Sequence, residues 1–241
     1  MSEAIILFDL PSKAPHGCWS FNPWKTRLLL SYKGLDFRTE WVEYPNIKAR
    51  LSPHASVPPN QDDTPYTIPT IHIPSTNTYV MDSWKIAQHI EALHPSPPLH
   101  LSSPVLAKLD ALMLGVKRAL QCIYIPRIPQ VLLNDASVAY WYETRERDVG
   151  MTLAQLEDKY PAAGCWERAG PVLREVTALL EEGEGGPFFM GGEVSYADFV
   201  WGGFLLFLGR LGMLEEALAR SGGEEVHRGL LKGLEPWVRD D

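Results

Sequence analysis

A proline-rich stretch, HPSPPLHLSSP at residues 94–104, divides the chain into two parts with different patterns. Before it, short strand-like runs alternate with helical ones, whereas every apolar periodicity beyond it is helical. Exposed proline-rich segments of this kind are typical of domain boundaries. We therefore predict a first domain over 1–94, a linker over 95–104 and an all-helical domain over 105–241.

The first forty or so residues have the pattern of a βαβ unit. Ile5–Asp9 and Phe37–Tyr44 are of strand length, and Trp24–Lys33 between them has the composition of a helix. Asn22 suits the N-cap of this helix and Pro23 its first position. Two strands joined through a helix are expected to be parallel.

The rest of the first part predicts a loop, a hairpin and a helix. Ser52–Pro65 is rich in Pro, Ser and Asp, and a short irregular helix is expected before it at Asn46–Leu51. The β-prone runs YTIPTIHI and TYVMDS are joined by Pro74–Asn77, which predicts an antiparallel hairpin. The helical stripe of Ser83–Leu93 completes the order β-α-β, loop, β-β-α.

The second part has long amphipathic repeats and one helix with a distinct start signal. Ser195 is followed three residues later by Asp198, which is a capping-box arrangement. The run Phe199–Leu208 behind it is apolar on every side, so this helix is expected to be buried in the middle of the helical domain.

Composition excludes several classes of function. Hydrophobic residues make up 45% of the chain, its net charge is −8, and no run of Lys and Arg is present to neutralise several phosphates. We therefore expect no nucleic-acid partner, no membrane span and no secretory signal. The cysteines, Cys18, Cys122 and Cys165, form neither a disulfide framework nor a metal-binding pattern, which favours the reducing cytoplasm.

Three short motifs fall on the predicted elements. TIPT places Ile68-Pro69 directly before a strand, where a trans proline on an edge strand is the simplest interpretation. Asp82-Ser83 ends the next strand and begins the next helix, where a plain N-cap is the simplest interpretation. SFNPWKTRLLL, from Ser20, runs from a polar turn into an apolar helix.

Together these motifs resemble the cytosolic glutathione transferases, whose first domain is thioredoxin-like. The stretch DLPSK…WSFNPWKTRLLLSYKGLDFRTEWVEYP closely resembles the fungal, serine-bearing, etherase-like (FuA-type) branch, which is related to the omega-type transferases. The close likeness covers about the first 45 residues and the looser one covers the whole chain. It implies an α/β thioredoxin-like N-terminal domain, an all-α C-terminal domain, glutathione as the bound cofactor, and a homodimer.

The resemblance also assigns glutathione-binding residues. It implies a cis bond between Ile68 and Pro69, with the backbone of Ile68 offered to the cysteinyl part of glutathione. Asp82 and Ser83 fall where the family binds the γ-glutamyl amine and carboxylate, and a helix start suits an anion. The family recruits a partner for the glycine carboxylate near Lys48–His54, but no residue there is singled out.

Ser20 falls on the family's catalytic position, with Cys18 as the competing candidate. A free thiol has a pKa of about 8.5, and lowering it by about two units takes roughly 2.7 kcal/mol. A helix N-terminus supplies about 0.3–1 kcal/mol and at most about 2. A hydrogen bond from the Ser20 hydroxyl to the sulfur, worth about 1.5–3 kcal/mol, would supply the rest of the required free energy. Asn22 is either an amide donor to the sulfur or only the N-cap.

The second substrate is expected between the domains, where the candidates to line its site are Tyr124, Arg127, Tyr140 and Trp141. Because they lie at helical spacing, these residues are also consistent with a role in the core.

The first functional hypothesis is thiolate addition to a bulky hydrophobic electrophile. Elimination after addition would give ether cleavage or cis–trans isomerisation, as in secondary metabolism. The second hypothesis is a carrier or regulatory protein that binds hydrophobic ligands without turnover.

Overall fold

The computed structural model describes residues 4–14, 17–54, 59–60 and 64–239. Within these residues, a four-stranded sheet has the strand order β2-β1-β3-β4. β1 (Ile5–Asp9) runs parallel to β2 (Phe37–Trp41), and β3 (Thr70–Ile73) pairs antiparallel with both β1 and β4 (Thr78–Met81). The predicted βαβ unit and hairpin are therefore confirmed. β2 ends three residues early because a 3₁₀ turn, η1 (Tyr44–Asn46), follows it.

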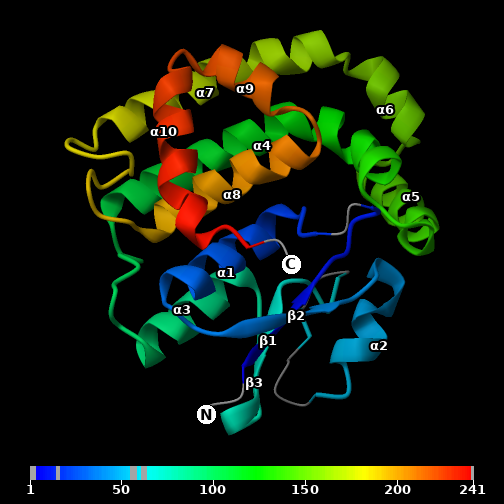
Figure 1. The fold of residues 1–241 in the computed structure, drawn as a ribbon. Helices are drawn as coiled ribbons and strands as arrows, with labels where there is room; N and C mark the ends of the chain where they lie inside the picture. Colours follow the sequence, from blue (N-terminus) through cyan, green and yellow to red (C-terminus); the bar gives the residue numbers. More distant parts are fainter. Residues whose placement is uncertain (1–3, 15–16, 55–58, 61–63, 240–241) are drawn as a thin grey trace.

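Three helices accompany the sheet. α1 (Phe21–Tyr32) and α3 (Ser83–Leu93) contact one another beside it, while the short α2 (Ile47–Leu51) lies apart from that pair (Figure 1). A second short turn, η2 (Pro74–Thr76), joins β3 to β4.

The start of α1 differs from the prediction. The helix begins at Phe21, with Ser20 as its N-cap residue, so the capping role expected for Asn22 is wrong. Asn22 and Pro23 instead occupy the second and third helical positions. Proline is tolerated there because the first N–H groups of a helix have no intrahelical acceptor. The first such bond runs from Trp24 N to Ser20 O at 3.1 Å.

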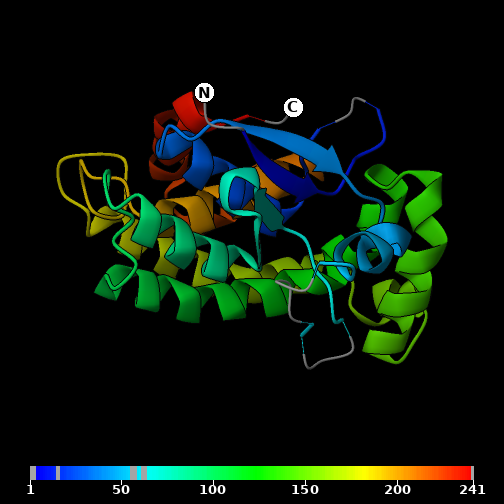
Figure 2. The ribbon, with the colours of Figure 1, turned by 90° about the horizontal axis from the view of Figure 1, so that it is seen from below.

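The remainder of the chain is helical, as predicted. Its elements are α4 (Pro104–Val131), α5 (Asp135–Val149), α6 (Leu153–Lys159), α7 (Ala162–Glu181), α8 (Tyr196–Arg210), α9 (Leu214–Ser221), α10 (Glu224–Leu234) and the 3₁₀ turn η3 (Glu235–Trp237). They form a bundle stacked on the sheet-containing part, with α5 at its side, next to η1 (Figures 1 and 2). Together the two parts confirm the expected thioredoxin-like and all-helical architecture. Within the described residues, no helix combines the length and apolarity needed to cross a membrane.

α8 is buried, as predicted, and it also joins the two parts of the molecule. It packs against α1 on one side and against α4, α9 and α10 on others. Its start is fixed by the predicted capping box, in which the Asp198 carboxylate accepts a hydrogen bond from Ser195 N at 2.7 Å. The same carboxylate also accepts from Phe189 N, in the preceding loop, at 2.8 Å. Burial raises the pKa of Asp198 to about 6, and these hydrogen bonds oppose the rise.

A buried ion pair ties α1 to the sheet. Arg27 Nε lies 2.8 Å from Asp9 Oδ2, and both side chains are fully buried. Arg27 also donates to Thr39 Oγ1 on β2 at 2.7 Å and to Arg239 O near the C-terminus at 3.1 Å. Burial raises the pKa of Asp9, while the Arg27 guanidinium opposes that rise. One side chain thus holds α1, β1, β2 and the last described residue together.

We expect Arg27→Met to lower the free energy of unfolding by about 3–5 kcal/mol, because it leaves the Asp9 carboxylate buried without its counter-ion. Urea denaturation measures this change. The double variant Asp9→Leu/Arg27→Met should recover much of the loss, because no uncompensated charge remains. Arg220→Met, which removes an exposed ion pair with Glu216, is the matched control and should change stability little. An Arg27→Met protein as stable as this control would contradict the assignment.

Candidate functional site

A polar cavity of about 530 Å³ lies between the sheet-containing part and α5. The first part lines it with the start of α1, the Ile68-Pro69 turn and the start of α3. α5 contributes the opposite side. The lining residues are Ser20, Asn22, Tyr44, Ile47, Asn60, Thr64, Tyr66, Thr67, Ile68, Pro69, Asp82, Ser83, Tyr140, Glu143, Thr144, Arg145 and Arg147. A lining of both charge signs suits a ligand that itself carries both.

The turn before β3 and the start of α3 are joined at the floor of this cavity. The Ile68-Pro69 peptide bond is cis, as the resemblance implies, and Asp82 N donates to Pro69 O at 3.1 Å. Asp82 has φ 84°, an uncommon conformation for a residue other than glycine. Such strain is typical of ligand-binding sites, where the surrounding structure sustains it.

Asp82 uses part of its own carboxylate to cap α3. Its Oδ1 accepts from Trp84 N at 2.9 Å and from Lys85 N at 3.1 Å. Two N–H groups expected to be available for an anion are therefore already satisfied. Ser83, whose carbonyl accepts from Tyr196 OH at 3.1 Å, remains in the lining with its hydroxyl and N–H.

The start of α1 is open to a ligand. Ser20 has extended backbone angles, its side chain makes no capping hydrogen bond, and the first turn contains no acidic residue. Neither the positive end of the helix nor its first N–H groups are therefore neutralised by a local side chain. Such a helix start attracts an anion or a developing thiolate.

A second, aromatic cavity of about 240 Å³ meets the polar one at Ser20, Asn22 and Tyr44. Its other lining residues come from the turn before α1 and from α1, α4, α5 and α8: Trp19, Phe21, Lys117, Tyr124, Ile128, Trp141, Phe204 and Phe207. Phe21 packs edge to face on Phe204 at 5.4 Å, and Tyr124 on Phe207 at 5.3 Å, between ring centroids. Ser20 therefore stands where a polar and an aromatic compartment join.

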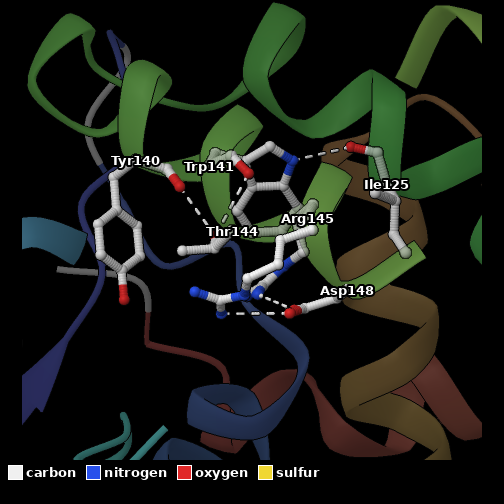
Figure 3. Close-up of polar contacts among 7 residues, drawn as sticks. Ile125, Tyr140, Trp141, Thr144, Arg145 and Asp148 are labelled. Atoms are coloured by element: carbon white, nitrogen blue, oxygen red, sulfur yellow. Dashed lines mark hydrogen bonds and ion pairs between the residues drawn. The ribbon is translucent and has the colours of Figure 1, made fainter. Parts of the chain in front are cut away.

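Trp141 is fixed in the aromatic wall by a proline in a neighbouring helix. Pro129 in α4 has no N–H, so it leaves the Ile125 carbonyl without its helical donor. Trp141 Nε1 donates to that carbonyl at 3.0 Å (Figure 3). The guanidinium of Arg145 lies over the Trp141 ring, 4.5 Å from its centroid, and pairs with Asp148 at 3.2 Å.

Tyr44 joins η1 to α5 at the meeting point of the cavities. Its ring stacks on Tyr140 at 5.9 Å and packs edge-on to Trp141 at 5.5 Å, between centroids. Its backbone N donates to Ser137 Oγ at 3.1 Å. Burial raises the pKa of Tyr44, and the nearby Arg145 guanidinium opposes the rise. The phenol therefore stays protonated and neutral.

The structure gathers most of the predicted site residues and leaves two outside. The polar cavity contains Ser20, Asn22, Ile68, Pro69, Asp82, Ser83 and Tyr140, and the aromatic cavity contains Ser20, Asn22, Tyr124 and Trp141. Cys18 and Arg127 are absent from the described lining of both cavities. The outcome for each of them has a clear physical cause.

Cys18 faces the buried ion pair instead of a cavity. Its side chain is fully buried beside Asp9. Burial raises the pKa of this thiol well above its usual range, and the nearby Asp9 carboxylate raises it further. A thiol held protonated and covered in this way is a poor nucleophile.

Arg127 points to the end of α8. Its Nε donates to Leu211 O at 2.6 Å, which satisfies a carbonyl at the C-terminus of that helix.

The sequence prediction missed Tyr44, Lys117, Arg145 and Arg147. Spacing contained a signal for two of the helical faces. On α5, spacings of four and three residues separate Tyr140, Thr144 and Arg147. On α4, spacings of seven and four residues separate Lys117, Tyr124 and Ile128. Each set therefore shares one side of its helix. Nothing in the sequence marks which side faces the other part of the molecule.

The fold and the paired cavities agree with comparisons to known proteins. The glutathione S-transferase N-terminal domain matches residues 19–93, and the glutathione S-transferase C-terminal domain matches residues 109–230. The chain belongs to the glutathione S-transferase family.

Its relatives include fungal members of that family. The glutathione S-transferase-like protein ustS of Aspergillus flavus is 33% identical over 233 residues, which cover 87% of this chain and 82% of the relative. A Ceriporiopsis subvermispora glutathione S-transferase, solved in complex with glutathione, is 29% identical with a TM-score of 0.84, covering 99% of this chain and 100% of that one. Glutathione transferase GSTFuA2 of Phanerochaete chrysosporium is 25% identical with a TM-score of 0.86, covering 100% of both chains. The predicted FuA-type resemblance is confirmed.

Proposed function

We propose that this protein is a glutathione-dependent transferase that acts on a bulky hydrophobic electrophile. One observation carries the proposal: Ser20, at the uncapped start of α1, lies where the polar and aromatic cavities meet. A peptide thiol in the first cavity and an apolar carbon in the second would approach one another there. The glutathione-bound relative from Ceriporiopsis supports the choice of thiol.

In this proposal glutathione extends along the polar cavity. Its γ-glutamyl ammonium pairs with Asp82, whose Oδ2 accepts no hydrogen bond from the described residues, and its α-carboxylate takes the hydroxyl and N–H of Ser83. The backbone of Ile68 pairs with the cysteinyl part. The sulfur then lies at the start of α1, beside Ser20.

Ser20 stabilises the thiolate in this arrangement. Its hydroxyl donates to the sulfur, worth about 1.5–3 kcal/mol, and the α1 N-terminus adds about 0.3–1 kcal/mol. Their sum is about the 2.7 kcal/mol needed to lower a thiol pKa by two units. Asn22 exposes its side chain on the same first turn and is proposed as a second donor. The thiol proton leaves to solvent.

The thiolate then attacks the electrophilic carbon, and a carbon–sulfur bond forms. In a substitution the leaving group departs with its electron pair, so one glutathione conjugate and one anion result. In the ether-cleaving variant the leaving group is an alkoxide or phenolate. In the isomerising variant, addition is followed by rotation and loss of the thiolate, which returns glutathione unchanged. Tyr124, Tyr140 and Trp141 are proposed to contact the electrophile.

We expect Ser20→Ala to lower kcat/KM for glutathione and chlorodinitrobenzene by about 10- to 100-fold, because the sulfur loses a hydrogen-bond donor. Ser20→Thr should retain part of the activity, since it keeps the hydroxyl. Cys18→Ala is the matched control and should retain full activity, because that thiol is covered and protonated. Initial rates followed by absorbance measure all three variants.

Two results would contradict the proposal. Loss of turnover in Cys18→Ala alone would assign the sulfur chemistry to Cys18. Absence of turnover in every form, together with tight binding of a hydrophobic dye, would instead favour the carrier function.

We further propose that the protein is a homodimer, as its family resemblance implies. Trp84 and Leu93 on α3 and Leu114 on α4 are large apolar side chains that are 38%, 54% and 48% exposed. Burying such side chains against a second copy removes apolar surface from water. Sedimentation velocity should give the mass of two chains, and Leu114→Glu should shift it toward one. A wild-type protein that sediments as a single chain would refute the dimer.

A further inference from the structure

Lys117 is the one charged side chain in the described lining of the aromatic cavity. It lies on α4, on the side that also presents Tyr124 and Ile128, and it is half-buried. A charged group is costly to bury among aromatic rings unless it acquires a partner. Its presence there therefore indicates a constraint on what the cavity binds.

The local charges do not neutralise Lys117. It forms no ion pair within the part of the chain that the structure describes, although Asp110, two turns earlier on α4, is close enough for the two charges to interact. Asp110 is shared with a second cation, Lys25 of α1, whose ammonium lies 4.7 Å from the centroid of the Phe21 ring. Burial and the nearby Lys117 lower the pKa of Lys25 to about 8, although Asp82 and Asp110 oppose the change. Asp110 therefore interacts with two ammonium groups, and within the described residues it forms an ion pair with neither.

The rest of the cavity is suited to an aromatic ring. Phe21, Phe204 and Phe207 already pack edge to face or tilted on one another, and Trp141 is fixed by its hydrogen bond to Ile125. About 240 Å³ accommodates a small aromatic body. A negative charge is the strongest polar complement that such a ligand could offer the Lys117 ammonium.

We propose that the aromatic cavity selects an aromatic electrophile that bears a carboxylate, and that Lys117 Nζ is the cation that pairs with it. This inference rests on the proposed function, whose substrate class it narrows from hydrophobic electrophiles to acidic aromatic ones. Lys117 is then a specificity-determining residue: it contacts the acid group, while Ser20 contacts the sulfur of glutathione.

The test compares chlorodinitrobenzoate with its methyl ester, each rate being divided by the uncatalysed rate with glutathione. These substrates share ring and leaving group and differ in charge. We expect the wild type to favour the acid. Lys117→Met should lower kcat/KM for the acid by about 10- to 100-fold and leave the ester nearly unchanged, because only the acid loses a charge-assisted contact. Lys117→Arg should preserve the preference.

Lys108→Met is the matched control. Lys108 lies on the same helix, is exposed, pairs with Glu182 and is absent from both described linings, so its removal makes the same change in net charge without touching the cavity. The preference for the acid should be unchanged in this variant. If it falls as much as in Lys117→Met, the effect is a long-range field and the pairing is refuted.

Equilibrium binding separates this inference from the proposed function. Dinitrobenzoate, which has no leaving halide, and its methyl ester are titrated into each variant with tryptophan fluorescence as the signal. Lys117-dependent binding of the acid without turnover of either electrophile would uphold the cavity and refute the transferase. Good turnover of the ester, with no preference for the acid and no effect of Lys117→Met, would refute the pairing and leave the transferase intact. Equal losses for acid and ester would also refute it.

Discussion

The buried ion pair between Asp9 and Arg27 determines where α1 begins relative to the sheet. Arg27 lies two turns after Ser20, so holding its guanidinium on β1 and β2 also fixes the first turn of the helix. The same carboxylate lies beside Cys18 and disfavours its thiolate. This ion pair therefore positions the hydroxyl that we assign to the sulfur, while burial and, after it, the Asp9 carboxylate keep the neighbouring thiol protonated.

The site is built where two kinds of surface meet. The sheet-containing part supplies backbone turns and polar side chains, which suit a peptide. The helical part supplies rings on α4, α5 and α8, which suit an apolar electrophile. The contact of α8 with α1 and the contact of α5 with η1 fix the two surfaces relative to one another. Glu43 strengthens the second contact by accepting from Asn134 Nδ2 at 2.8 Å and from Ser137 Oγ.

Local signals in the sequence predicted much of this molecule, and contacts between distant segments limited the rest. The strand-length runs, the hairpin turn and the Ser195–Asp198 cap depend on neighbours in the chain, and the structure confirms them. The start of α1 was misplaced because Pro23 is accepted at any first-turn position. Helical spacing placed Tyr124 and Arg127 on one helix without indicating which side of it faces the site. The roles of Tyr44 and Lys117 depend on contacts between the two parts, which no local pattern encodes.

The account's central claim is that the start of α1, with Ser20, stabilises the thiolate of glutathione. Ultraviolet titration of glutathione bound to the protein measures the pKa of that thiol directly. We expect a value about two units below the free thiol in the wild type, and a shift back toward the free value in Ser20→Ala. Glutathione that binds both proteins with the pKa of its thiol unchanged would contradict the account.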